Sequence, residues 1–272
     1  MARLPDTLLD ACLCDPAAPF GQDPARDFGL DKCSAQQALA ELRPWLNRQQ
    51  RMLWASGNDA LLLILQGTDC SGKDGVIRRV LNCIDPQGLR LHSFSKPDAC
   101  EQRHDFLWRY QRRLPKPGLL GVFNRSYYEG LISDPQDGLC SVDELPARQQ
   151  AIAALESQWP QQHLHPLKCF LHISKTEQHQ RLSERLEKPH KRWKLHASDL
   201  QSYRQYELRQ QRWTEQLRAT HNAAAPWYVI PADHRWLRDW LVASLLAREL
   251  ERLQPAWPEQ PPPFSLNDLG PQ

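Results

Sequence analysis

Short apolar runs alternate along the chain with segments of helical periodicity. Unbroken apolar runs at 60–66, 118–124 and 167–173 are typical of strands buried on both faces of a sheet. Segments 88–94 and 227–230 add two further candidate strands. Helical patterns fill the intervals, at 34–54, 71–84, 101–113, 141–159, 174–185, 198–217 and 233–253. This order predicts an α/β fold with a mostly parallel sheet.

Helix-capping patterns and proline content divide the chain into three parts. Residues 1–33 are proline-rich and predict an irregular lead-in, and residues 254–272 predict an extended proline-rich tail. Between them, 34–253 is expected to form one domain. Ser34, Ser141 and Ser174 each precede a Gln or Glu by three residues, which predicts that each begins a helix. Asp233 is expected to cap the last helix.

Composition excludes several classes of protein. With 41 % hydrophobic residues and a net charge of +2 over 272 residues, the chain can bury a core and is not a basic coat for nucleic acid. The longest apolar stretch is far short of the roughly 20 residues that span a bilayer, and the first residues lack a secretory pattern. Eight cysteines without a C-x-x-C pair predict free thiols in a reducing cytoplasm, and no zinc site is expected.

The segment 67–75 is the most informative stretch. It places G-x-x-x-x-G-K directly after a buried strand and before a helix, so inward amides, the helix N-terminus and Lys73 can hold phosphate. The predicted phosphate-binding residues are Gly67, Ser71, Gly72, Lys73, Asp74 and Gly75. Because Asp74 replaces the usual Ser or Thr, Asp69 could supply the metal-binding carboxylate instead. The alternative is an ordinary turn with a surface lysine, in which Asp69 braces the loop.

Basic residues concentrate in two further places. Arg181, Arg185 and Lys188 fall on one helix face, followed by Lys191 and Lys194. Such a cluster could track a polyanion, or it could be a solvated face paired with Glu184 and Glu187. Lys96 lies just beyond a predicted strand end and could hold the same chain of phosphates.

Several ordered motifs resemble the polyphosphate kinase 2 family. They are G-x-D-x-x-G-K-D-G at 67–75, H-D-F-L-W-R at 104–109, N-R-S-Y-Y-E at 124–129, R-L-E-K-P-H-K-R-W-K at 185–194 and P-W-Y-V-I-P-A-D at 226–233. The resemblance covers about residues 35–253. It implies a P-loop kinase-like three-layer fold of the thymidylate-kinase type with a helical lid at about 176–220. It also implies phosphoryl transfer between inorganic polyphosphate and a nucleotide.

The resemblance assigns roles to individual residues. Asp69 and Lys73 become the loop's metal and phosphate residues, and Arg125 binds phosphate. In the lid, Arg185 is expected to stabilise the transition state, and the residues expected on polyphosphate are Arg181, Lys188, Lys191 and Lys194. Many family members have Asp where this chain has Asn124, so the candidate metal ligands are Asp69, Asn124 and Glu129. Asn124 could instead be a turn former, and Glu129 an ion-pair partner of Arg125.

The combined expectation is a cytoplasmic kinase that uses Mg²⁺, or Mn²⁺ in its place. It would transfer a phosphoryl group reversibly from polyphosphate to AMP, ADP or both, as a homo-oligomer without nucleic-acid or membrane partners. Two alternatives stay open: an ATP-dependent small-molecule or nucleotide kinase of the P-loop class, and a non-catalytic polyphosphate-binding module, which Asn124 favours.

Overall fold

A single parallel sheet forms the centre of the molecule. The computed structural model describes residues 3–259 and 261–269, and its five strands follow the order β2-β3-β1-β4-β5. All four strand pairs are parallel, which confirms the predicted α/β class. The strands are β1 (Ala60–Gln66), β2 (Leu89–Ser93), β3 (Leu120–Asn124), β4 (Leu164–His172) and β5 (Trp227–Pro231).

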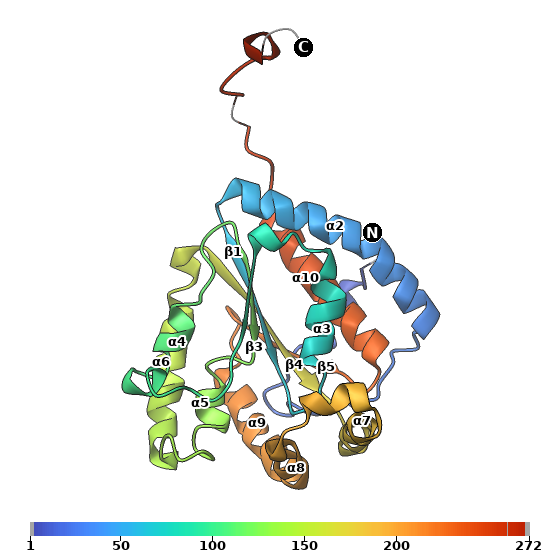
Figure 1. Cartoon of the computed structure of the whole chain (residues 1–272), viewed down its shortest axis with the longest axis vertical. Coiled ribbons are helices and arrows are strands. Elements are labelled where there is room, and N and C mark those ends of the chain that lie inside the picture. Colours follow the sequence, from blue (N-terminus) through green and yellow to red (C-terminus); the bar gives the residue numbers. More distant parts are fainter. Residues whose placement is uncertain (1–2, 260, 270–272) are drawn as a thin grey trace.

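Helices cover both faces of the sheet and complete three layers (Figure 1). One face carries α2 (Lys32–Ser56), α3 (Lys73–Val80) and α10 (Arg235–Leu253), and the other carries α4 (Trp108–Gln111), α5 (Glu129–Ile132), α6 (Leu145–Ser157) and α9 (Tyr206–Thr220). Side chains of β1 alternate between the two cores: Leu61, Leu63 and Leu65 enter the first, and Leu62 and Ile64 enter the second. Burial on both faces explains why β1 is an unbroken apolar run.

Two helix starts differ from the prediction. Helix α2 begins at Lys32, because the Asp31 carboxylate accepts hydrogen bonds from the backbone N–H groups of Cys33 and Ser34. The helix then continues through Pro44 without a break. Asp233 does not cap α10; its carboxylate accepts from the backbone N–H of Ser174 at 2.8 Å, and so braces the start of α7 (Lys175–Glu187).

In two intervals where the sequence predicts one long helix, the structure contains shorter elements. The interval 101–113 contains a 3₁₀ turn, Glu101–Arg103, and the four-residue helix α4, because the Asp105 carboxylate accepts from the N–H of Leu107 and forms a turn between them. The interval 198–217 is divided at Gln205 into α8 (Ala197–Arg204) and α9. The predicted starts at Ser141 and Ser174 are confirmed by their cap hydrogen bonds.

The two ends of the chain behave differently. The lead-in is less irregular than predicted, since its described residues contain α1 (Asp6–Asp10) and bury Leu4 and Leu9. Leu13 also forms an isolated antiparallel bridge with Tyr228 of β5. After α10 the described tail has only one 3₁₀ turn, Leu266–Leu269, and leads away from the body (Figure 1). The tail prediction also covers residues 260 and 270–272, which lie outside the described residues.

The carboxyl ends of the strands meet at one edge of the sheet. Parallel pairing aligns Leu65 of β1 with Asn124 of β3 and with Cys169 of β4, so the loops that follow these strands become neighbours. Helices α7 and α8 lie at this same edge (Figure 1). None of the described helices is long and apolar enough to cross a membrane.

Candidate functional site

The loop between β1 and α3 folds through three left-handed residues. Gly67, Cys70 and Gly72 have φ angles of 143°, 68° and 101°. A Cβ on Gly67 would lie 2.6 Å from the Leu171 carbonyl oxygen, and a Cβ on Gly72 would overlap the Arg238 guanidinium. These two glycines are therefore needed both for their backbone conformation and for the close approach of neighbouring groups.

Lys73 lies back across this loop. Its Nζ donates hydrogen bonds to the carbonyl oxygens of Gly67 at 2.7 Å and Thr68 at 3.3 Å. The side chain is buried, and burial together with the nearby Arg125 charge lowers the pKa of Lys73. An ammonium held at the mouth of a helix N-terminus can meet a phosphate oxygen with little reorganisation.

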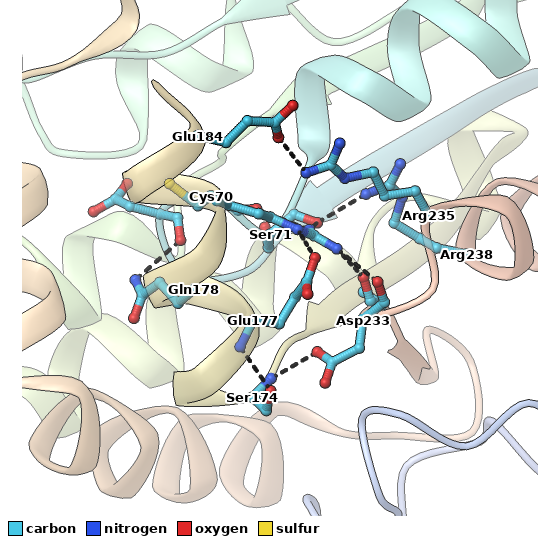
Figure 2. A network of polar contacts seen from close by, with 12 residues as sticks. Cys70, Ser71, Ser174, Glu177, Gln178, Glu184, Asp233, Arg235 and Arg238 are labelled. Carbon is cyan, nitrogen blue, oxygen red and sulfur yellow. Dashed lines mark hydrogen bonds and ion pairs between the residues drawn. The ribbon is translucent and has the colours of Figure 1, made fainter. Parts of the chain in front are cut away.

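Two buried arginines, Arg181 and Arg238, bind backbone carbonyls of the loop, and Figure 2 shows Arg238 beside Ser71. Arg181 donates through Nη1 to the carbonyls of Cys70 and Ser71, both at 2.9 Å, and Arg238 donates to the same Ser71 carbonyl at 3.1 Å. Arg238 is also paired with Asp239, and burial lowers its pKa to about 10. Because C=O and N–H of one peptide group point in opposite directions, the Ser71 carbonyl turns the N–H of Gly72 away from these arginines.

The turn after β3 joins the loop through Arg125. Its backbone is left-handed, with φ 64°, and its N–H donates to the Leu65 carbonyl at 3.0 Å. The guanidinium lies 2.9 Å from Oδ1 of Asp69 and 3.8 Å from Oε2 of Glu129. Burial alone would raise the pKa of Asp69, but Arg125 and Lys73 outweigh it and hold this pKa below its usual value. Asp69 is therefore an ionised carboxylate at neutral pH.

Asp74 connects this turn with the lid. Asn124 donates through Nδ2 to one Asp74 oxygen at 3.0 Å, and Lys194 Nζ lies 3.5 Å from the other. Burial raises the pKa of Asp74, but these two partners and Lys73 outweigh it, so the pKa is lowered. The departure from Ser or Thr after Lys73 thus places a second ionised carboxylate at the start of α3.

The segment predicted as the lid, about 176–220, contains α7, a 3₁₀ turn (Pro189–Lys194), α8 and α9. Because α9 packs in the core beside the sheet, the name lid segment is used below for α7, the turn and α8 alone. Glu184 accepts hydrogen bonds from Lys188 at 2.7 Å, Lys191 at 2.6 Å and Arg235 of α10 at 2.9 Å. These hydrogen bonds hold the pKa of Glu184 far below its usual value. Arg185 points elsewhere, with Nη1 3.5 Å from the buried Asp199 carboxylate. The predicted common face of α7 therefore has separate partners for each of its cations.

Loop, turn and lid enclose a cavity of about 550 Å³. Ten basic and four acidic side chains line it, so the cavity suits a highly anionic ligand. The basic ones are Lys73, Arg78, Arg79, Arg125, Arg181, Arg185, Lys191, Lys194, Arg235 and Arg238.

The structure brings most of the predicted site residues together, but not all of them. Asp69, Gly72, Lys73, Asp74, Gly75, Asn124, Arg125, Arg181, Arg185, Lys191 and Lys194 line the cavity. Five predicted residues are not among the residues that line it: Gly67 and Ser71 belong to the loop itself, and the other three have partners elsewhere. Lys96 pairs with Asp137 at 3.4 Å, Lys188 is paired with Glu184, and Glu129 accepts from Ser133 at 2.5 Å.

Sequence reasoning missed Arg235, Arg238 and Asp199. One signal was available for Arg238 and Asp239, since two charged residues interrupt the apolar pattern of the last helix. Such an interruption within a buried helix indicates paired charges. Nothing in the local sequence distinguishes Asp199 from a helix-capping acid, and its carboxylate does accept from the N–H of His196.

The chain resembles known proteins over most of its length. Residues 29–256 match the family described as Polyphosphate kinase 2 (PPK2). The AMP/ADP-polyphosphate phosphotransferase of Meiothermus ruber is 39 % identical over 240 residues, which cover 88 % of this chain and 90 % of that protein. The ADP-polyphosphate phosphotransferase of Rhodopseudomonas palustris is 39 % identical, over 80 % of this chain and 79 % of that protein.

A solved structure extends the similarity to the fold. The crystal structure of polyphosphate kinase 2 from Arthrobacter aurescens TC1 superposes with a TM-score of 0.86 and 35 % sequence identity. The match covers 92 % of this chain and 89 % of that one. The P-loop kinase-like fold expected from the motifs is thereby confirmed.

Proposed function

The chain belongs to the polyphosphate kinase 2 family of phosphotransferases, and we propose that it transfers a phosphoryl group between inorganic polyphosphate and AMP or ADP, in either direction. The observation that carries the proposal is the cavity lined by ten basic side chains, Lys73 among them, which come from α3, the turn after β3, the lid segment and α10. A polyphosphate chain and a nucleotide are both anionic along their phosphates, and both need such a surface when they meet. The relative from Meiothermus ruber is named for transfer between polyphosphate and AMP or ADP, and the relative from Rhodopseudomonas palustris for transfer with ADP, which supports the same substrates.

The donor set in the cavity fits a magnesium ion. Mg²⁺ is commonly held by one or two carboxylates together with substrate phosphates. Asp69 and Asp74 line the cavity with lowered pKa values, and the Asn124 side chain lies beside Asp74. Among residues 3–259 and 261–269 no cluster of three or more His, Cys, Asp or Glu is gathered for a metal, which agrees with a site completed by phosphates.

Asp69, Asp74 and Asn124 would hold this ion, and Mn²⁺ presents the same preference for oxygen. When bound, the metal would neutralise negative charge on the substrate phosphates. Asn124 would contribute its uncharged amide oxygen in this set. Glu129, a candidate from the sequence, instead faces Ser133 and Arg125, so its contribution would be to orient Arg125.

The side chains of the chain itself supply positioning and positive charge. Lys73 would bind the transferred phosphoryl group; its position at the start of α3, held by hydrogen bonds to the Gly67 and Thr68 carbonyls, supports this role. Arg125, from the turn after β3, and Arg185, from the lid segment, line the same cavity as Lys73. Three cations on three separate elements can surround the transferred phosphoryl group. Electrostatic stabilisation of this kind accounts for most of the rate enhancement in phosphoryl transfer.

A donor assay tests the proposal. Purified protein is incubated with long-chain polyphosphate and either AMP or ADP, with Mg²⁺ and then with excess chelator, and the nucleotide products are separated and measured. We expect ADP to form from AMP, or ATP from ADP, only when the metal is present. When ATP replaces AMP and ADP in the mixture, we expect the polyphosphate chains to lengthen. Transfer from ATP to a small molecule without any use of polyphosphate would overturn the proposal. Tight polyphosphate binding without turnover in Mg²⁺ or Mn²⁺ would overturn it equally.

A further inference from the structure

A second groove lies beside the cavity. It has a volume of about 610 Å³ and runs between the first half of α2, the end of α3 and the first turns of α10. Arg79 and Arg235 line both the groove and the cavity, so the two spaces adjoin. Figure 1 shows α2 and α10 side by side on the α3 face of the sheet, and they are in direct contact. The groove thus leads from the site onto an outer face of the domain.

Positive charge dominates this groove. Lys32, Arg43, Arg79 and Arg235 line it, against Asp233 and Asp239. Both acids already accept hydrogen bonds from within the fold: Asp233 from the backbone of Ser174, and Asp239 from Arg238 and Arg79.

The cations of α2 are less engaged. Lys32 is exposed, and among the described residues neither Lys32 nor Arg43 forms an ion pair with an acid. Arg43 donates through Nη2 to the Arg79 carbonyl at 2.9 Å, while its buried Nε–H has no hydrogen-bond partner in the described part of the chain. Lys32 and Arg43 therefore bring to the groove two positive charges that no carboxylate among the described residues pairs with.

We propose that this groove is a second binding subsite for polyphosphate, which holds the phosphate units that extend beyond the catalytic cavity. The inference rests on the proposed function. A long chain that leaves the cavity past Arg235 and Arg79 enters the groove directly and meets Arg43 and Lys32 in turn. A short chain ends before it reaches α2. The groove is therefore a device for preferring long chains over short ones, and it takes no part in the transfer step.

Charge reversal in the groove tests the subsite. Lys32→Glu and Gln36→Glu add negative charge at two exposed lining positions of α2. Arg48→Glu is the matched control, because Arg48 is exposed on the same helix, is absent from the groove lining and undergoes the same charge change as Lys32. An acidic residue in the first turn of α2 is favourable to the helix, so Lys32→Glu is expected to fold.

KM for long-chain polyphosphate is expected to rise about three- to tenfold in the Lys32→Glu, Gln36→Glu double variant, in line with the loss of one or two surface ion contacts. The salt dependence of that KM should weaken. KM for a short oligophosphate, KM for ADP and kcat should stay within about twofold of the wild type, and Arg48→Glu should change none of them. An unchanged KM for long chains would overturn the subsite, and so would an equal rise for short chains or for ADP.

Direct binding separates this inference from the proposed function. Long-chain polyphosphate labelled at one end is titrated with each variant at two salt concentrations, and the dissociation constant is measured without turnover. Weaker binding in the double variant but not in Arg48→Glu supports the groove even if the wild type catalyses no transfer. Equal binding by all three proteins contradicts the groove, whatever the donor assay shows.

Discussion

The loop and the lid both depend on arginine and lysine, but they use these residues in opposite ways. Behind the loop, Arg181 and Arg238 are 5 % and 1 % exposed, and they donate to fixed backbone carbonyls. In the lid, Lys188 and Lys191 have side chains that are 49 % and 32 % exposed, and they share one carboxylate, Glu184. Buried cations with backbone partners cannot change partners without a large cost, whereas exposed cations exchange them easily.

This difference indicates which cations serve the fold and which can serve a substrate. A polyanion that enters the cavity competes with Glu184 for lysines that are already near water. It gains nothing from Arg238, whose removal from Asp239 would leave a buried carboxylate with fewer partners. The loop is therefore preorganised, and the lid is available for rearrangement.

The largest effect is expected at Lys73, the loop cation that faces the cavity. Lys73→Ala should lower kcat by about a thousandfold, because one preorganised charge at the transferred group is lost. The protein should stay folded, with a lower melting temperature, because the Gly67 and Thr68 carbonyls lose a buried donor. Steady-state assays with polyphosphate and ADP, and a thermal unfolding curve, measure both. Lys116→Ala, an exposed lysine that lines neither the cavity nor the second groove, is the control and should retain near wild-type activity. Wild-type activity in Lys73→Ala would contradict the role of the loop.

Arg238→Ala tests the buried side of the comparison. It removes a donor from the Ser71 carbonyl and leaves Asp239 with Arg79 alone, so the free energy of unfolding should fall by about 3 kcal/mol. Chemical denaturation measures this change. Arg252→Ala, at the exposed end of the same helix, should change stability by less than about 0.5 kcal/mol.

If Arg238→Ala does not fold, Arg238→Lys provides a second measurement. It keeps the charge near Asp239 but loses the planar fork, and an intermediate loss of stability is expected. A full return to wild-type stability would show that charge alone, and not the contact with the loop carbonyl, is what matters at this position.

A substitution of Arg185 tests the cation of the lid segment that pairs with Asp199 and not with Glu184. Arg185→Ala should reduce kcat by about a hundredfold, with little change in nucleotide affinity, because a charge that acts in the transition state is removed. Arg204→Ala, on an exposed position of α8, is the control. Single-turnover rates and nucleotide binding are measured on both. Equal losses in rate and affinity would assign Arg185 to substrate binding.

The smallest effect is expected at Glu184. Glu184→Gln releases Lys188, Lys191 and Arg235 from their shared carboxylate, so KM for polyphosphate should fall about two- to fivefold. The effect should fade at high salt, because exposed ion pairs are screened. Glu187→Gln, an exposed neighbour on α7, removes the same charge and is the control. A higher KM in Glu184→Gln would mean that the ion pairs help to bind the polyanion.

Strand positions and the loop were predictable because each is specified locally. An unbroken apolar run from Ala60 to Leu65 fits only a doubly buried segment, and G-x-x-x-x-G-K specifies its own turn. The partners of long side chains were not predictable. Helical spacing places Arg181 and Arg185 on one face. It does not reveal that Arg181 donates to loop carbonyls whereas Arg185 pairs with Asp199. Asp233 braces α7 instead of α10 for the same reason, since β4 and β5 bring Ser174 to it.

The Ser71 carbonyl also connects the loop with two helices. Arg181 belongs to α7 and Arg238 to α10, and both are fastened to one carbonyl of the loop. The first turns of α7 are thereby fixed to the loop between β1 and α3, so a movement of the lid segment would involve only the chain beyond Arg181. Arg185 lies one helical turn beyond Arg181, so the Arg185 side chain has little freedom to move relative to the loop. Its position therefore depends on the same Ser71 carbonyl that fixes the loop.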